Sequence, residues 1–302
     1  MRRKQFHLIL MPTEKCNFRC VYCYESFTIP KMSPLVVDRV KRYTDFLFKE
    51  GYELLIEFFG GEPMVAYDVI TEVLDHVRGN EYEGMMTTNG YLLSKEKFVR
   101  LVEMRVKQYE ITFDGEREFH DKVRPTVGGK GTFNTILSNL RSAMQTDLDF
   151  EILVRMHLHG GQVNSIKSLI DVMEEFNDDP RFKFMLRPIA HLGGPLDRMI
   201  KLPTKEEFEE ASQYARKLKR LDSFFTLKDE DIPMCYASSP RSIVIRSDGT
   251  LAKCTVKLDS EVNKIGYLGE DGLPVIDMKK MMFWTRGHLS GRKEELSCPA
   301  SE

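Results

Sequence analysis

The chain has 302 residues, with 44 Lys and Arg against 46 Asp and Glu, a formal net charge of −2 at pH 7 and 42% hydrophobic residues. This length can bury a large core, and the basic residues are spread along the chain, so the composition does not indicate nucleic-acid binding. No apolar run approaches the ~18 residues of a membrane span, and Phe6–Met11 is shorter than the ~7–15 apolar residues of a secretory signal. We therefore expect a soluble protein of the cytoplasm with no membrane or nucleic-acid partner.

Strand and helix patterns alternate over the first 190 residues. Apolar, β-branched or aromatic runs predict six strands, at Gln5–Met11, Leu54–Phe59, Gly84–Thr88, Gln108–Phe113, Phe150–Met156 and Phe182–Leu186. Helical periodicity between them predicts helices at Pro34–Lys49, Ala66–Val77, Lys95–Met104, Phe133–Met144 and Ser165–Glu175. This alternation indicates an α/β fold with a parallel sheet and crossover helices. Because a complete TIM-type barrel needs about eight strands, six strands predict a partial (β/α)6 barrel.

Turn residues follow several of these strands and mark the expected site. The turns are Gly60-Gly61, Asn89-Gly90, Asp114-Gly115 and Gly193-Gly194, after the second, third, fourth and sixth strands. In parallel α/β folds ligands bind at the carboxyl ends of the strands. We therefore expect the site to be built from these turns.

The pattern changes after residue 194. A charged amphipathic helix is predicted at Lys205–Leu221, a linker at Phe224–Pro233, and short strands such as Ser242–Arg246 after it. We place a boundary near residue 200, which predicts a barrel domain over residues 1–200 and a small C-terminal region over residues 201–302.

Three cysteines lie in the loop directly after the first strand. Cys16, Cys20 and Cys23 have the spacing C-x3-C-x2-C, and in a chain without an export signal they are expected to be reduced thiols. Three thiolates from one loop can bind three corners of a [4Fe–4S] cluster and leave one iron open. A zinc site would need a fourth Cys or His nearby, and a redox Cys-x2-Cys pair would leave Cys16 without a role.

The cysteine loop resembles the signature of a known family. The C-x3-C-x-aromatic-C motif of radical S-adenosylmethionine enzymes, which fold as partial (β/α)6 barrels, resembles the pattern of Cys16, Cys20, Tyr22 and Cys23. The Gly-Gly-Glu-Pro motif of that family resembles the segment Phe58-Phe59-Gly60-Gly61-Glu62-Pro63. The resemblance implies which residues bind S-adenosylmethionine. Tyr22 would lie near the adenine, and the methionyl amino group would be held by Gly60, Gly61, Glu62 and Pro63. The ribose and the carboxylate would be reached by Thr88, Asn89 and Arg155. The resemblance further implies reductive cleavage of this cofactor to a 5′-deoxyadenosyl radical that abstracts a carbon-bound hydrogen, with a flavodoxin- or ferredoxin-type electron donor.

A second group of cysteines lies near the C-terminus. Cys235 and Cys254 bracket the predicted strand Ser242–Arg246 and the turn Asp248-Gly249, so a hairpin would bring two thiolates to one metal centre. This spacing resembles the start of the SPASM or twitch extension of radical enzymes, a C-terminal region that binds auxiliary clusters. A full SPASM module has several more cysteines, whereas here only Cys298 follows. We expect one auxiliary [4Fe–4S] cluster on Cys235, Cys254 and Cys298, with an open or non-cysteine fourth ligand. Alternatively, the three cysteines are ordinary small, buried hydrophobic residues, or the chain is truncated before the remaining cysteines of the module.

Other polar residues at strand ends are catalytic candidates. Asp114 and His120, after the fourth strand, could exchange a proton during turnover, although such residues more often tether a turn. His157 and His159 alternate at the end of the fifth strand, but a metal site would need a third ligand.

The subgroup resemblance implies an oxidoreductase-type maturase that crosslinks or otherwise oxidises a ribosomally made peptide. Since the motif begins at residue 16, we expect the leader peptide to bind elsewhere, for example on a separate protein. The alternatives are a sulfatase-maturing enzyme, a small-molecule radical dehydrogenase and a methylthiolating RNA enzyme. Sulfatase maturases have Asp where Thr255 follows Cys254, and an RNA enzyme would need a basic module. A non-catalytic iron–sulfur carrier would not need the Gly-Gly-Glu-Pro element.

Overall fold

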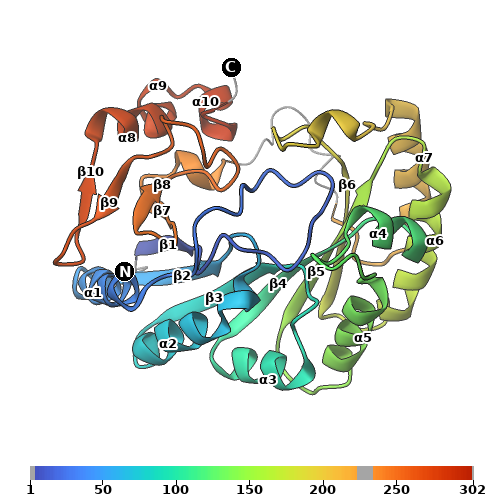
Figure 1. Ribbon diagram of the computed structural model, residues 1–302, viewed down its shortest axis with the longest axis horizontal. Helices are drawn as coiled ribbons and strands as arrows, with labels where there is room; N and C mark the ends of the chain where they lie inside the picture. The colour runs from blue at the N-terminus through green and yellow to red at the C-terminus, as the bar shows by residue number, and fades with distance from the viewer. Residues whose placement is uncertain (1–3, 223–233, 301–302) are drawn as a thin grey trace. The chain divides into compact units, whose positions relative to one another are not determined.

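The chain divides into two units, each assembled from segments that are far apart in the sequence. A computed structural model describes residues 4–222 and 234–300 (Figure 1). Unit 1 comprises residues 4–15, 27–86 and 234–300, and unit 2 comprises residues 16–26 and 87–222. These units divide the chain differently from the expected boundary near residue 200, and that boundary stays a prediction. The predicted linker Phe224–Pro233 lies outside the described residues. No helix in the described part of the chain is long and apolar enough to cross a membrane.

Unit 1 is built on a mixed sheet. Its parallel strands are β1 (Lys4–Leu10), β2 (Tyr52–Phe58) and β3 (Tyr82–Thr88), which continues into unit 2, with Leu10 opposite Phe58 and Phe58 opposite Met86. On the other edge, β1 pairs in parallel with β7 (Ser242–Ile245), and antiparallel strands β8 (Thr250–Ala252), β9 (Gly266–Leu268) and β10 (Pro274–Ile276) follow. The C-terminal strands therefore extend the same sheet that begins with β1.

Helices of unit 1 bury regular apolar stripes. Helix α1 (Pro34–Lys49) begins with Pro34 after Ser33, whose hydroxyl accepts a hydrogen bond from the Val36 amide, and α2 (Tyr67–Val77) follows the 3₁₀ turn η1 (Pro63–Ala66). The remaining helices of the unit are η6 (Tyr236–Ser238), α8 (Met278–Thr285), α9 (Gly287–Ser290) and α10 (Lys293–Ser297).

Unit 2 contains three parallel strands, β4 (Val106–Phe113), β5 (Glu151–Leu158) and β6 (Phe182–Pro188). Its helices are α3 (Lys95–Glu103), α4 (Arg117–Val123), α5 (Phe133–Met144), α6 (Val163–Met173) and α7 (Lys205–Ala215), with the 3₁₀ turns η2 (Glu174–Phe176) and η3 (Asp197–Met199). Figure 1 shows α5 and α6 along the outer side of these strands. Aromatic pairs fill that face, such as Phe98 on Tyr109 and Phe113 on Phe133. The opposite face is polar, and its residues include Glu110, Thr112, Arg155, His157 and Arg187.

All six predicted strands and all five predicted helices before residue 190 are confirmed, with ends that shift by a few residues. Helix α4 was missed because seven residues show too little periodicity. The prediction of one helix over Lys205–Leu221 was wrong, since α7 ends at Ala215. There the chain turns so that Arg220 donates hydrogen bonds to the carbonyls of Phe182 and Asn177, at 2.8 and 2.6 Å.

Candidate functional site

The three N-terminal cysteines lie on one anchored loop of unit 2. Cys16, Cys20 and Cys23 are half-buried free thiols. The loop is held by backbone hydrogen bonds from Arg19 to the Pro125 carbonyl, at 2.9 Å, and from Val21 to the Val123 carbonyl, at 3.0 Å. The last residue of α4 and the segment after it therefore position the loop between the cysteines.

The environment of these thiols keeps them protonated in the absence of a metal. Burial raises the pKa of the Cys20 thiol, and burial raises the pKa of the Cys23 thiol to about 12, so neither ionises at neutral pH without a metal. Among residues 4–222 and 234–300, no three His, Cys, Asp or Glu side chains lie close enough to hold a single metal ion. A [4Fe–4S] cluster places each thiolate on a different iron, so its ligands lie farther apart than those of one ion. The donor set fits such a cluster.

Two glycines of unit 1 lie tightly against the residues that precede Cys16. A Cβ on Gly60, whose φ is +120°, would lie 2.4 Å from the Thr13 carbonyl oxygen, and one on Gly61 would lie 2.5 Å from that of Glu14. The Gly61 amide donates to the Thr13 carbonyl at 3.3 Å, and the Glu62 amide to the Lys15 carbonyl at 3.0 Å. Only glycine allows this approach of the two backbones.

The side chain of Glu62 is buried and caps a helical turn. Its Oε1 accepts a hydrogen bond from the Met64 amide at 2.9 Å, and Pro63 occupies the first position of η1. The cap explains why a carboxylate precedes Pro63 here. Contact of Glu62 with a methionyl amino group stays a prediction.

A buried carboxylate gathers four side chains in unit 2. Asp114 Oδ2 accepts a hydrogen bond from the Tyr22 hydroxyl at 2.8 Å, and His159 Nε2 lies 2.9 Å from Oδ1. His157 Nδ1 lies 3.2 Å from the same Oδ1, and Arg124 lies 3.4 Å from Oδ2 and also donates to the Tyr22 hydroxyl. Burial alone would raise the pKa of the Asp114 carboxyl, but His157, His159 and Arg124 hold it well below its usual range.

This cluster was only partly visible in the sequence. Asp114 and Tyr22 were singled out separately, and the alternation of His157 and His159 gave no sign that both rings meet one carboxylate. The Tyr22 ring contacts both histidines, with centroids 5.5 and 5.7 Å apart, so its orientation is set from several sides. Arg124 was missed as a partner, because the distance of 102 residues from Tyr22 carries no local signal.

Two of the other candidate cofactor residues of unit 2, Thr88 and Asn89, lie at the end of β3, whereas Arg155 lies inside β5 and not, as expected, at its end. Thr88 is buried and accepts a hydrogen bond from the Gly90 amide at 3.1 Å, while Asn89 Nδ2 donates to Asn17 at 2.8 Å and lies 3.9 Å from Cys16 Sγ. Asn89 is thus beside the cysteine loop. Arg155 Nε lies 3.3 Å from Glu110 on the neighbouring strand, and its side chain is 32% exposed.

His120 is buried with both ring nitrogens engaged. Nδ1 accepts from the Asp114 amide at 3.1 Å, and Nε2 lies 3.1 Å from the Thr132 hydroxyl. These contacts give His120 a structural use; a catalytic use stays a prediction.

The C-terminal cysteines are brought to one region of unit 1. The Cys235 amide donates to the Leu296 carbonyl at 2.8 Å, which joins it to the segment before Cys298, and the Cys254 amide donates to Asn263 at 2.9 Å. Burial raises the pKa of the Cys235 thiol, and Cys254 and Cys298 raise it further, so the three thiols are near enough to interact. Lys253 lies fully buried beside them, with Nζ 2.6 Å from the Ser239 carbonyl.

Comparison with known proteins gives matches in sequence and in fold. The sequence model of the Radical SAM superfamily matches residues 10–176. The chain is 29% identical over 164 residues to an Fe-coproporphyrin III synthase of Methanosarcina barkeri, covering 54% of this chain and 39% of that protein. It is 23% identical over 292 residues to an AdoMet-dependent heme synthase of Oleidesulfovibrio alaskensis, covering 91% and 73%. The chain thus spans less than half the length of the first relative.

Solved structures share the fold at low sequence identity. The structure of anSMEcpe with bound AdoMet superimposes with a TM-score of 0.68 at 17% identity, covering 95% of this chain and 79% of that one. SuiB of Streptococcus suis, bound to its precursor peptide SuiA, gives a TM-score of 0.62 at 15% identity, covering 87% and 62%. These likenesses show the predicted fold, a parallel α/β partial barrel.

Proposed function

Because the chain belongs to the radical SAM superfamily, we propose that it cleaves S-adenosylmethionine reductively and uses the resulting radical to abstract a carbon-bound hydrogen. The observation that carries this proposal is the anchored loop with three half-buried thiols, Cys16, Cys20 and Cys23. When bound there, a [4Fe–4S] cluster would supply the electron for cleavage. The protein's own part is to hold the cofactor and exclude water.

The residues proposed to bind the cofactor follow β2 and β3, lie within β5, or belong to the cysteine loop. Gly60 and Gly61 allow the close approach of the backbone of residues 13–15 that fixes the turn before Glu62. The Glu62 carboxylate would bind the methionyl amino group by a charge-assisted hydrogen bond. Arg155 would pair with the carboxylate, and Thr88 and Asn89 would meet the ribose. The Tyr22 ring, held by Asp114 and Arg124, would lie beside the adenine.

We propose a ribosomally made peptide as the substrate, with a crosslink or another oxidised residue as the product. Support comes from fold likeness over nearly the whole chain: anSMEcpe with bound AdoMet and Cp18Cys peptide has a TM-score of 0.70 and covers 99% of this chain. Electrons would come from a flavodoxin- or ferredoxin-type donor, and a separate protein would bind the leader. The six free cysteines support the expected cytoplasmic location.

The C-terminal region is proposed to hold one auxiliary [4Fe–4S] cluster on Cys235, Cys254 and Cys298. The hydrogen bond from the Cys235 amide to the Leu296 carbonyl, two residues before Cys298, supports this assignment. This cluster would belong to a twitch-like region over residues 201–302.

A second candidate substrate is a small carboxylic acid of the tetrapyrrole type. The sequence relatives favour it, because the heme synthase aligns over 91% of this chain. In this case the enzyme would be a small-molecule radical oxidase.

The test is anaerobic incubation of the reduced, iron-reconstituted protein with S-adenosylmethionine, followed by chromatography for 5′-deoxyadenosine. The protein should form it, and the variant with Ala at Cys16, Cys20 and Cys23 should not. A matched control with Ala at Cys235, Cys254 and Cys298 should still form it. Formation by the first variant would refute the proposal. Mass spectrometry of a co-expressed peptide from a neighbouring gene, and of added Fe-coproporphyrin III, then separates the two substrates.

A further inference from the structure

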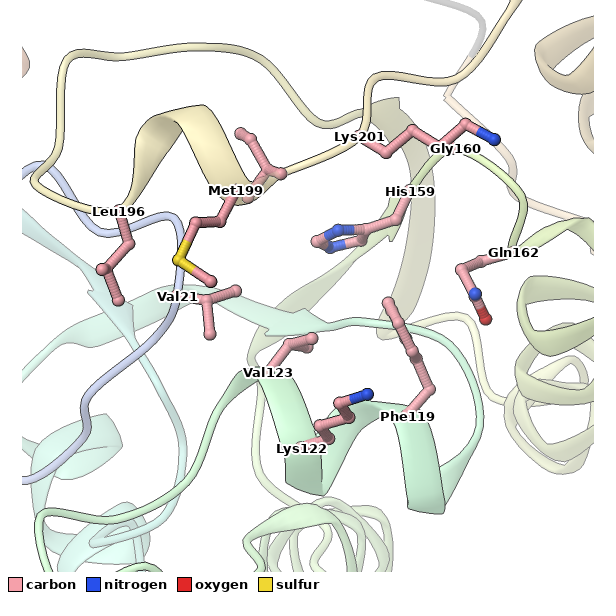
Figure 2. A pocket seen from close by; sticks show the side chains of 11 residues that line it. Val21, Phe119, Lys122, Val123, His159, Gly160, Gln162, Leu196, Met199 and Lys201 are labelled. Carbon is pink, nitrogen blue, oxygen red and sulfur yellow. The ribbon is translucent and has the colours of Figure 1, made fainter.

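A cavity of about 400 Å³ lies beside the cysteine loop in unit 2 (Figure 2). Its walls come from four segments: Val21 of the loop, one face of α4, the turn after β5, and the segment from Leu196 to Lys201. This volume lies in the range of small-molecule sites, roughly 300–1,000 Å³, which combine apolar walls with a few polar groups.

The walls are fixed by backbone contacts, so the cavity is preformed. Val21 is hydrogen-bonded to the Val123 carbonyl at 3.0 Å, and the Gly160 amide donates to the Lys201 carbonyl at 2.8 Å. A Cβ on Gly160 would lie 2.3 Å from the Leu202 carbonyl oxygen, so the turn and the 196–202 segment are in direct contact. A ligand would therefore not need to order these walls.

One polar side chain, His159, points into the cavity from a buried position. His159 is only 5% exposed, and Figure 2 shows its ring directed between Met199, Val21 and Phe119. Nε2 lies 2.9 Å from the Asp114 carboxylate, which has no proton to give, so Nε2 donates. Nδ1 has no hydrogen-bond partner anywhere in the described residues, and it is left for a ligand.

The rim of the cavity combines apolar and positive groups. Leu196 and Met199 are 45% and 78% exposed there, and Val123 and Phe119 form the opposite wall. Lys122, which also lines the cavity, makes no ion pair with any residue in 4–222 or 234–300. Lys201 lies over Gly161, close enough to Glu207 to lower the pKa of that carboxyl, so its charge is partly balanced. Lys122 is therefore the cation available to a ligand.

We propose that this cavity binds an apolar, aromatic group that carries a carboxylate. The ring would occupy the walls formed by Val21, Val123 and Met199, the carboxylate would meet Lys122, and a donor on the ring would meet His159 Nδ1. The proposal that the cavity binds such a ligand is argued from the geometry of the cavity alone. The proposal that this ligand is part of the substrate rests on the proposed function.

Isothermal titration calorimetry of the anaerobically purified protein tests this proposal, with indole-3-acetate as the probe and indole-3-acetamide as its neutral analogue. The acetate should bind, and the acetamide about fivefold more weakly. Lys122→Met should weaken acetate binding by about the same factor and leave acetamide binding unchanged. Met199→Asp, a change at an exposed side chain that should fold normally, should also weaken acetate binding, because it adds a like charge.

The matched control is Lys130→Met, the same change at an exposed lysine that does not line the cavity. Equal acetate affinities of Lys122→Met and Lys130→Met, or no binding by the unaltered protein, would overturn the proposal. Displacement of the acetate by S-adenosylmethionine would also overturn it, because the cavity would then belong to the cofactor site. None of these measurements depends on cofactor cleavage. Failure of the binding proposal can therefore be distinguished from failure of the proposed function.

Discussion

A buried ion pair in unit 1 gives a prediction for stability. Arg246 follows β7, and its guanidinium forms a fork on Glu14, with Nε 2.7 Å from Oε1 and NH2 2.9 Å from Oε2. The two side chains are 5% and 0% exposed. The remaining nitrogen donates to the Leu258 carbonyl at 3.0 Å. We predict that Arg246→Met is strongly destabilising, because it leaves the Glu14 carboxylate buried and without its counter-charge.

The expected loss is about 3–5 kcal/mol, the usual cost of removing one partner from a buried pair. The chain contains a matched control in Arg141 and Glu175, which form the same fork at 2.9 and 3.0 Å while their side chains are 50% and 30% exposed. Since solvent screens the exposed pair, Arg141→Met should cost about 1 kcal/mol or less. Both variants lose the fork on a carboxylate; Arg246→Met also loses the hydrogen bond to the Leu258 carbonyl, and the larger difference between them is burial.

Urea unfolding of the anaerobically purified variants, followed by circular dichroism, measures the difference. The double variant Glu14→Leu with Arg246→Met should recover much of the stability, because an apolar pair leaves no buried charge. Equal losses in Arg246→Met and Arg141→Met would refute the reasoning, as would a double variant no more stable than Arg246→Met.

Three further predictions concern the cofactor and cluster residues. Gly61→Ala should abolish S-adenosylmethionine binding in equilibrium dialysis, because its Cβ would lie 2.5 Å from the Glu14 carbonyl oxygen and the turn must move; unchanged affinity would contradict this. Glu62→Gln keeps an oxygen for the Met64 cap but removes the charge, so the protein should stay folded and bind the cofactor about tenfold more weakly; equal affinity would remove Glu62 from the site. Ala at Cys235, Cys254 and Cys298 should lower iron by about four atoms per chain in a well-folded protein; unchanged iron content would show that no second cluster exists.

The parts of the fold and site that the sequence predicted are those with a local signal. Strands such as Leu54–Phe59 and the helix Pro34–Lys49 have clear periodicity, and the spacing of Cys16, Cys20 and Cys23 is contained in eight residues. The pairing of β1 with β7 could not be predicted, because it joins segments more than 230 residues apart. The same limit hid the ring of partners around Asp114 and the fork between Glu14 and Arg246. No local pattern in an α/β chain specifies which distant charges become neighbours.

His120 gives a prediction for pH dependence. Thr132 Oγ1 donates its own proton to the Arg124 carbonyl at 2.8 Å, so His120 Nε2 must donate to Oγ1, and Nδ1 accepts from the Asp114 amide. The neutral ring therefore satisfies every contact, whereas a second proton, on Nδ1, would face an N–H group. Burial, assisted by the charge of Arg124, lowers the pKa of His120 to about 3.

Between pH 6.5 and 3 the unfolded chain would bind a proton at His120 that the folded protein does not. The contribution of His120 to the free energy of unfolding should therefore be complete above pH 6.5. Below pH 6.5 this residue alone should lower the free energy of unfolding by up to about 1.4 kcal/mol per pH unit. Histidine-selective NMR should show the His120 ring neutral at pH 5. In urea unfolding at pH 7 and 5, His120→Asn should show a smaller loss on acidification than the unaltered protein, since Asn retains an acceptor but does not titrate. An ordinary titration of His120 near pH 6.5 would show that its contacts do not hold the neutral form, and the loss of stability on acidification would then have to come from other groups.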